Sequence, residues 1–363
     1  MTNTSQKDGE LESLLKSFIS FKSVDDQPIQ KQECLDWICT AFLSEKISSV
    51  QMGICADSPW IYLPHPNCKL LIFAHVDVVP ASDNLFDLRI EGDKAWGRGT
   101  SDMKGNILPF LMAYRDAIKE GIDLPISILI TTDEEVAGNT IPHLIDTGVV
   151  SAPVAFTPDS NDIGIVCEHK GVVWSELICH GKGGHGAYPW DTENPSWLLA
   201  DALQKIREDF PSGGHDDWQM TVSPTTLKGS SARNQVDDQV TCGLDIRFPP
   251  EVCSSPEEAL AKVSEVLPEG CEIREVLSAS PLNTPEDHPM VELFKEIAEK
   301  VLDTSIGFKR EHGGTDARYF SERGIPAFLY GPKGAGLHSK DEWVSIESLQ
   351  KHYEMYRELF CRL

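Results

Sequence analysis

A histidine and an aspartate follow an apolar run and share one face of the strand that the run predicts. The run Leu71–Ala74 is followed by His75, Val76 and Asp77, and side chains two positions apart in a strand point the same way. Burying an imidazole beside a carboxylate is costly unless a partner offsets it. A metal ion on His75, with Asp77 holding the other ring nitrogen, would do so. A neutral histidine bonded to an aspartate at a strand end is the alternative.

Acidic residues occupy two further segments. Asp102 lies among glycines just before a predicted helix, a composition that allows a tight backbone path; capping of that helix is the alternative role. Asp133, Glu134 and Glu135 come directly after another apolar run. Because adjacent acids repel one another without a cation or proton between them, one can bind a metal while the next acts as a base. A solvated acidic loop is the alternative.

Asp159 and His338 complete a recurring pattern. Asp159 follows a short apolar run, and His338 lies in a glycine-rich loop after the predicted strand 327–330. Ligand sites gather beyond the carboxyl ends of parallel strands. The order His, Asp, Glu, Asp, His, in loops that follow apolar strands, therefore predicts a metal site assembled from several strands.

The elements expected around these residues form an α/β fold. Apolar strands at 70–74 and 126–132 flank a helix at 107–118, and the order strand, helix, strand favours a parallel sheet. From residue 172 the pattern changes to α+β. Its expected elements are strands at 172–179, 219–222 and 240–248 and a helix at 193–206. We therefore predict a discontinuous domain of residues 1–171 and 284–363, with a second domain inserted at 172–283.

Composition limits the class of protein. The chain has 363 residues and a net charge of −25, which disfavours nucleic acid as a partner because phosphate binding needs a basic face. It has no apolar stretch of the roughly 20 residues that span a bilayer, and its N-terminus lacks a signal-peptide pattern. We expect no membrane partner and a cytoplasmic location. The ten cysteines are then expected to be reduced thiols.

Six segments together resemble one protein family. The chain is similar to the M20 metallopeptidases, a group that includes succinyl-diaminopimelate desuccinylase, acetylornithine deacetylase, aminoacylase and several di- and carboxypeptidases. The segments, in the family's order, are HVDVVP (75–80), GRGTSDMKG (97–105), TTDEE (131–135), GHGAYP (184–189), GGTDAR (313–318) and GLHSKDE (336–342). The resemblance implies a zinc-peptidase-like catalytic domain and an inserted ferredoxin-like domain that serves for dimerisation or as a lid.

The resemblance also implies a pair of divalent ions. Zinc is favoured by the mixed histidine and carboxylate ligands, although cobalt and manganese suit such sites. Asp77 would orient a histidine ligand, and Glu134 would be the general base that takes a proton from a metal-bridging water. The implied ligands are His75 and Asp159 on one ion, Glu135 and His338 on the other, and Asp102 between them.

Residues of the predicted inserted domain and of the segment 313–318 are implied to contact the substrate. In the family, the histidine that matches His185 reaches the active site from the partner subunit of a dimer, where it would stabilise the tetrahedral oxyanion. Asn234, Arg247, Thr315 and Arg318 match segments that bind substrate, and Arg247 could pair with a substrate carboxylate. For Arg247 and Arg318, a structural salt bridge is the alternative.

The substrate stays open at this point. The loop 81–88 is shorter than in most relatives, and Asp159 replaces the glutamate usual in desuccinylases and deacetylases. Aspartate there tends to accompany peptidases, whereas the segment around GHGAYP resembles the desuccinylase. We therefore expect hydrolysis of an N-acyl amino acid, with a dipeptide or another short peptide as the alternative. A phosphoesterase and an inactive metal-binding homologue are more distant alternatives.

Overall fold

The computed structural model describes residues 2–214, 216–230 and 232–363. Contacts divide the chain into two compact units. The first comprises the chain up to Cys167, Thr284–Arg310 and Thr315–Leu363; the second comprises Glu168–Asn283 and Glu311–Gly314.

A mixed sheet has its main part in the first unit, and its last strand, β15, belongs to the segment of the second unit. Within the described residues its strand order is β1-β2-β6-β3-β7-β17-β8-β15, with β16 paired to β8. β3 runs parallel to β6 and β7, and β17 runs parallel to β7. The bounds are β1 Gln51–Cys55, β2 Ser58–Leu63, β3 Leu70–His75, β6 Ile126–Thr131, β7 Ala155–Thr157, β8 Ile165–His169, β15 Leu282–Asn283, β16 Phe308–Glu311 and β17 Ala327–Leu329.

The expected parallel sheet is therefore confirmed only for its centre. β1 and β2 form an antiparallel hairpin, and β2 is antiparallel to β6. The hairpin turns at Ala56 and Asp57, which both have positive φ (45° and 72°). Two consecutive residues with positive φ are the hallmark of a tight hairpin turn, and Ala56 gave no hint of it in the sequence.

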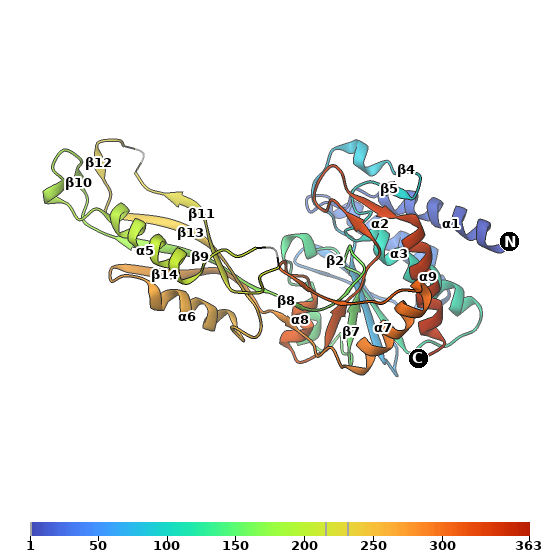
Figure 1. Ribbon diagram of the computed structural model, residues 1–363. Helices are drawn as coiled ribbons and strands as arrows, with labels where there is room; N and C mark the ends of the chain where they lie inside the picture. The colour runs from blue at the N-terminus through green and yellow to red at the C-terminus, as the bar shows by residue number, and fades with distance from the viewer. Residues whose placement is uncertain (1, 215, 231) are drawn as a thin grey trace. The chain divides into compact units, whose positions relative to one another are not determined.

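Helices cover both faces of this sheet (Figure 1). Phe156 of β7 packs on Phe294 of α7, with ring centroids 4.4 Å apart. Phe73 of β3 packs on Phe320 of α8 at 4.6 Å. α7 contacts α9, which contacts α1 and α3, whereas α8 contacts α4. The bounds are α1 Thr2–Ile19, α2 Pro28–Phe42, α3 Lys104–Lys119, α4 Thr140–Asp146, α7 Pro289–Leu302, α8 Ala317–Glu322 and α9 Ile346–Phe360.

A small antiparallel sheet brings two loops together. Its order is β18-β19-β5-β4, and the pairing of β19 with β5 places the segment after Trp96 beside the segment before Trp343. These segments carry Asp102 and His338. The bounds are β4 Arg89–Glu91, β5 Lys94–Trp96, β18 Gly334–Ala335 and β19 Trp343–Ser345, with short 3₁₀ helices at η1 Ser44–Ser49, η2 Asp83–Phe86 and η3 Glu134–Val136.

The second unit is a four-stranded antiparallel sheet, β11-β13-β9-β14, with α5 and α6 on one face (Figure 1). β13 alternates buried and less buried residues, the pattern of a strand covered on one side. Asn194 caps α5 by accepting a hydrogen bond from Ser196 N. The bounds are β9 Gly171–His180, β10 Gly184–His185, η4 Pro189–Asp191, α5 Pro195–Asp209, β11 Thr221–Lys228, β12 Gln235–Val236, β13 Gln239–Phe248, α6 Pro256–Val266 and β14 Cys271–Ala279.

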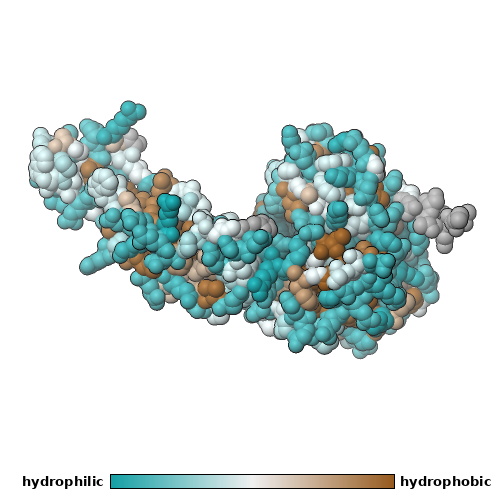
Figure 2. Space-filling view, viewed as in Figure 1, coloured by the Kyte–Doolittle hydropathy of each residue, from teal (hydrophilic) through white to brown (hydrophobic). Residues whose placement is uncertain are grey.

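The sequence misplaced one strand of this unit. The strand expected at 219–222 lies at Thr221–Lys228. Its bounds could not be read from the sequence because most of β11 is exposed and has no apolar alternation. The face shown in Figure 2 is mostly hydrophilic, as the net charge of −25 leads one to expect. Among the residues that the structure describes, no helix has the length and apolarity to cross a membrane.

Candidate metal centre

The end of one strand and four further segments, at one edge of the first sheet and in its neighbouring small sheet, carry the predicted ligands. His75 ends β3, Glu135 follows β6 and Asp159 follows β7. Since these strands are parallel, their carboxyl ends meet at the same edge. Asp102 and His338 come from the loops that flank β5 and β19. The chain thus gathers residues that are separated by up to about 260 positions.

Three of these residues lie close enough to share a metal ion, and a fourth, His338, contacts two of them. Single donor atoms of His75, Asp102 and Glu135 all fall within 4.8 Å of one another. His338 Nε2 is 3.0 Å from Asp102 Oδ2 and 3.1 Å from Glu135 Oε2. His75 Nε2 is 3.3 Å from the other Asp102 oxygen, Oδ1. Asp102 therefore faces one histidine with each oxygen, the geometry that a bridging carboxylate needs.

His75 has the surroundings of a metal ligand. It is 2% exposed, and its Nδ1 lies 3.1 Å from the Asp77 carbonyl oxygen and 3.4 Å from Asp77 Oδ1. Its buried Nε2 makes no hydrogen bond within the described part of the chain. An orphaned imidazole nitrogen beside a carboxylate is costly, and a divalent cation between them would remove that cost. The residues present therefore fit a metal ion.

Asp77 also links two ligand segments. Its Oδ2 accepts a hydrogen bond from Glu135 N at 2.9 Å, so the carboxylate that faces His75 also fixes the backbone of Glu135. Such outer partners set the orientation of ligands.

The histidines lie in a strongly negative field. Burial alone would lower the pKa of His75, but Asp102 and Asp77 outweigh it and raise that pKa well above its ordinary value. Asp102 and Glu135 raise the pKa of His338 to about 10. A field that holds a proton on both imidazoles also favours a divalent cation in its place.

The neighbouring carboxyl groups are buried close together, which disfavours their ionised forms. Burial, with Asp102 next, raises the pKa of Asp159 to about 7. Burial also raises the pKa of Glu134 well above its ordinary value, with Asp159 and Glu135 contributing. Acids this close cannot all ionise without positive charge among them. The charges of the cluster thus affect the pKa of Asp159, although its carboxylate lies outside the group of closest donor atoms.

Backbone geometry explains why glycine is needed after Asp102, and it shows an unfavourable backbone conformation at His338. A Cβ on Gly105 would lie 2.0 Å from Thr100 O, so only glycine lets the loop fold back onto the start of α3. The Asp102–Met103 peptide bond is cis. His338 has φ of 59°, a left-handed conformation that non-glycine residues seldom adopt and that gathers at functional sites.

His185 and Asn234 lie together in the second unit. Gly186 N donates to Asn234 O at 2.8 Å, and His185 pairs with Gln235 across β10 and β12. His185 and Asn234 line a recess of about 390 Å³, and both are exposed. The structure therefore pairs these two predicted residues with each other within the second unit.

Arg247 already has an acidic partner. Its Nε and Nη2 donate to Asp245 Oδ1 and Oδ2 at 2.7 and 3.1 Å, which is the structural salt bridge considered from the sequence. A substrate carboxylate would have to compete with Asp245 for the guanidinium.

Thr315 and Arg318 belong to the first unit. Thr315 Oγ1 accepts from Ala317 N at 3.3 Å at the start of α8. Arg318 is 8% exposed, and its Nη2 donates to Tyr319 Oη at 2.9 Å. The Tyr319 hydroxyl donates in turn to Gly138 O at 3.1 Å. Arg318 thus contacts α8's own tyrosine and, through it, the loop after Glu135.

Three buried polar residues beside the cluster escaped sequence reasoning. Asp316 is 5% exposed, and its Oδ1 has no hydrogen bond within the described residues. Glu342 and Asn106 are 1% and 0% exposed. Asp316 and Glu342 are acidic residues within the segments GGTDAR and GLHSKDE. Their position in these segments could have identified them as candidate site residues. Asn106 lies one residue beyond GRGTSDMKG.

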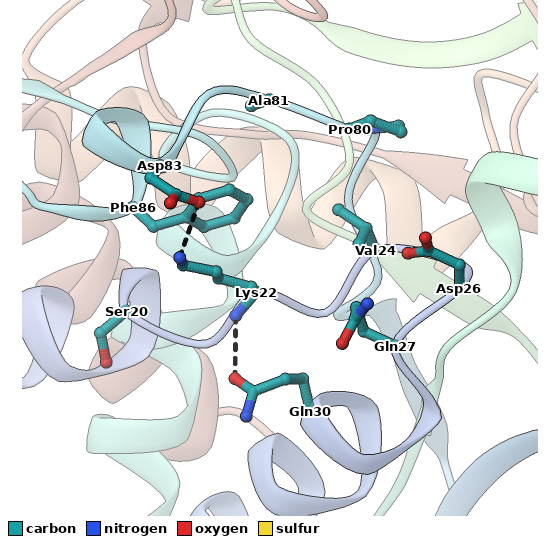
Figure 3. Close-up of a pocket in the computed structure, with 10 residues that line it drawn as sticks. All are labelled: Ser20, Lys22, Val24, Asp26, Gln27, Gln30, Pro80, Ala81, Asp83 and Phe86. Atoms are coloured by element: carbon teal, nitrogen blue, oxygen red, sulfur yellow. Dashed lines mark hydrogen bonds and ion pairs between the residues drawn. The ribbon is translucent and has the colours of Figure 1, made fainter.

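The short loop after Pro80 lines a separate recess of about 620 Å³ (Figure 3). Lys22 Nζ donates to Asp83 Oδ1 at 2.7 Å, and Lys22 N donates to Gln30 Oε1 at 3.2 Å. The described residues that line it include none of the predicted ligands or substrate contacts, so the loop's effect on a substrate pocket stays a prediction.

Comparisons of the sequence and of the structure with known proteins give consistent results. A sequence model described as peptidase family M20/M25/M40 matches residues 71–362. The chain is 28% identical over 375 residues to succinyl-diaminopimelate desuccinylase of Rickettsia bellii (strain OSU 85-389), which covers 94% of both chains. Aminopeptidase PepT from Bacillus cereus shares the fold with a TM-score of 0.80 at 19% identity, over 97% of this chain and 98% of that chain.

A second solved structure has the same architecture. The M20 family metallo-carboxypeptidase Sso-CP2 from Sulfolobus solfataricus aligns with a TM-score of 0.77 at 18% identity, over 98% of this chain and all of that one (100%). At these identities the two structures establish the mixed α/β fold.

Proposed function

The chain belongs to peptidase family M20/M25/M40, and from that membership we propose that it hydrolyses the amide bond of an N-acyl amino acid with two divalent metal ions. Relatives named succinyl-diaminopimelate desuccinylase support metal-dependent amide hydrolysis as the reaction class. The observation that carries the proposal is Asp102, which faces His75 with one oxygen and His338 with the other.

The proposed ligand set combines these contacts with the resemblance to the family, which is what assigns Asp159. We assign His75 and Asp159 to one ion, Glu135 and His338 to the other, and Asp102 to both. Bound divalent ions supply Lewis-acid polarisation of a carbonyl and activation of water. Zinc fits the mixed imidazole and carboxylate donors.

Glu134 is the proposed proton carrier. It adjoins Glu135, and burial with its acidic neighbours raises its pKa, which suits a group that takes up a proton during the reaction. Glu134 accepts a proton from the attacking water and passes it to the leaving amine. Asp77 keeps His75 in orientation and fixes the Glu135 backbone.

The second unit has the proposed role of a dimerisation or lid domain. His185 is exposed in a glycine-rich segment, which suits a donor that completes the oxyanion site of a partner subunit. We accordingly propose a homodimer. Asn234 would assist His185, and Thr315, Arg318 and Arg247 are the proposed substrate contacts. A cytoplasmic location is proposed with them.

N-acyl amino acids are the proposed substrates because of the desuccinylase relatives. Asp159 favours a second candidate, a dipeptidase or another exopeptidase on short peptides, since aspartate at this position tends to accompany peptidases in the resemblance described above.

A substrate panel tests the proposal. The protein, reconstituted with Zn²⁺ or Co²⁺, is assayed against N-succinyl and N-acetyl amino acids and a set of dipeptides, with and without chelator. The proposal expects chelator-sensitive release of the free amino acid from an N-acyl substrate. Turnover that survives complete metal removal would contradict it, and activity on dipeptides alone would favour the second candidate.

A further inference from the structure

The loop that carries Asp102 is held by a carboxylate from the loop that carries His338. Glu342 is 1% exposed, and its Oε1 accepts from Ser101 N at 2.9 Å and from Asp102 N at 3.1 Å. Its Oε2 accepts from Gly99 N at 3.0 Å and from Arg98 Nη1 at 2.5 Å. One side chain thus receives four donors, from Arg98, Gly99, Ser101 and Asp102, two on each carboxylate oxygen.

An amide from α3 holds the same loop against the loop that carries Asp159. Asn106 is 0% exposed, and its Nδ2 donates to Ser101 O at 2.7 Å. The same nitrogen lies 3.1 Å from Pro158 O and 3.0 Å from Ser160 O. These carbonyls belong to the two residues that flank Asp159, so Asn106 fixes the backbone on both sides of that residue.

The loops that carry Asp159 and His338 are also in contact with each other. Gly334 N donates to Asn161 O at 2.8 Å, and a Cβ on Gly334 would lie 2.2 Å from Ser101 Oγ. The loops that carry Asp102, Asp159 and His338 therefore approach one another within backbone distance.

We propose that Glu342 and Asn106 are positioning residues that set the geometry of the metal ligands by tying the Asp102 loop to the loops of His338 and Asp159. The inference rests on the proposed function, because it assumes that these three residues bind metal. Neither tie acts through the ligand's own side chain. Each fixes the peptide groups next to a ligand, which is how outer partners determine ligand orientation.

The chemistry of each tie predicts what its loss does. In Glu342→Gln, one acceptor oxygen becomes an NH₂ group that faces backbone N–H donors, so at least one of those bonds is lost. In Asn106→Ala, the carbonyls of Ser101, Pro158 and Ser160 lose their shared donor. Both changes loosen the loops and leave all five proposed ligands in place.

Metal affinity and ligand geometry test the proposal directly. The metal-free protein is titrated with Zn²⁺ by calorimetry, and the Co²⁺-loaded protein is examined by visible absorption, which reports the coordination geometry. We expect Glu342→Gln and Asn106→Ala each to weaken metal binding by about 10- to 100-fold and to change the Co²⁺ spectrum. Glu347→Gln makes the same chemical change on an exposed side chain of α9 and should match the wild type in both readouts.

A stability control separates positioning from general destabilisation. Leu349→Ala removes a fully buried side chain of α9 and lowers the melting temperature, because it leaves a cavity in the core. It should leave metal affinity and the Co²⁺ spectrum unchanged. Wild-type affinity and spectrum in both tie variants would overturn the proposal, as would the same losses in Leu349→Ala. If Glu342→Gln does not fold, Asn106→Ala decides alone. If the wild type itself binds no metal, the proposed function fails instead.

Discussion

The sites around His75 and His185 differ in how many of their contacts come from a single chain. His75 is 2% exposed and is surrounded by Asp77, Asp102 and Glu134. His185 is exposed, and its Nδ1 accepts a local hydrogen bond from Ala187 N at 3.1 Å. The first site carries the cost of buried charge and is fixed before any ligand arrives. The second carries no such cost, and its proposed role depends on a partner subunit.

The largest expected effect is on the buried side of this comparison. Glu134→Gln removes both proposed proton transfers and keeps the shape of the side chain. We expect kcat to fall by about 10²–10⁴-fold, while the protein still binds the wild-type number of metal ions. Steady-state kinetics together with metal analysis measure the two effects. Normal turnover by this variant would show that the base is misassigned.

His185→Ala tests the exposed side. Loss of an oxyanion donor costs about 10²–10³-fold in kcat, and because His185 is exposed we expect no change in melting temperature or metal content. His180→Ala, another exposed histidine of the second unit, is the matched control. If both variants keep full activity, His185 has no part in the reaction.

A third histidine shows that burial alone does not make a metal site. His352 is 1% exposed and stacks on Tyr330 with ring centroids 5.2 Å apart. Burial lowers its pKa from the ordinary 6.5 to about 4. The unfolded chain therefore binds this proton first as pH falls, so the group's contribution is full above pH 6.5 and is lost by about pH 4.

That contribution is on the order of 3 kcal/mol, from 1.36 kcal/mol for each pKa unit. In His352→Gln, the free energy of unfolding should depend less steeply on pH between 6.5 and 4 than in the wild type. Denaturant unfolding at several pH values measures the difference. Identical pH profiles for the two proteins would refute this account of His352.

A further expected effect links metal binding to pH, and its pH dependence has the opposite sign. In the metal-free protein the pKa of Asp159 is raised from 3.8 to about 7. The folded state then holds a proton that the unfolded chain has released, so metal-free stability declines as pH rises from about 4 to 7. Metal takes the proton's place, and the melting temperature gained on adding Zn²⁺ should grow by a few degrees over this range. A constant gain would contradict the role of Asp159.

The proposed ligands could be identified from the sequence more readily than the residues that position them. His75, Glu135 and Asp159 could be recognised because each follows an apolar strand. Glu342 and Asn106 could not, because their partners are backbone groups up to about 240 positions away that only the fold brings near. β14 and α6 were not predicted: β14 is largely exposed and lacks the apolar alternation by which strands are recognised.

Arg247 shows the same limit in another form. Its spacing from Asp245 allowed either a substrate contact or a salt bridge, and a bidentate pair forms in the structure. Two residues on one face of a strand decide between these roles by side-chain geometry, which spacing alone does not specify.

The central claim is that Asp102 bridges two metal ions. Titration of the metal-free protein with Zn²⁺ by calorimetry tests it most directly, in the wild type and in Asp102→Asn. We expect two ions bound for each wild-type chain and weakened binding of both in the variant, because Asp102 faces His75 and His338 with separate oxygens. A wild type that binds no Zn²⁺, or a variant that binds two ions with unchanged affinity, would contradict it.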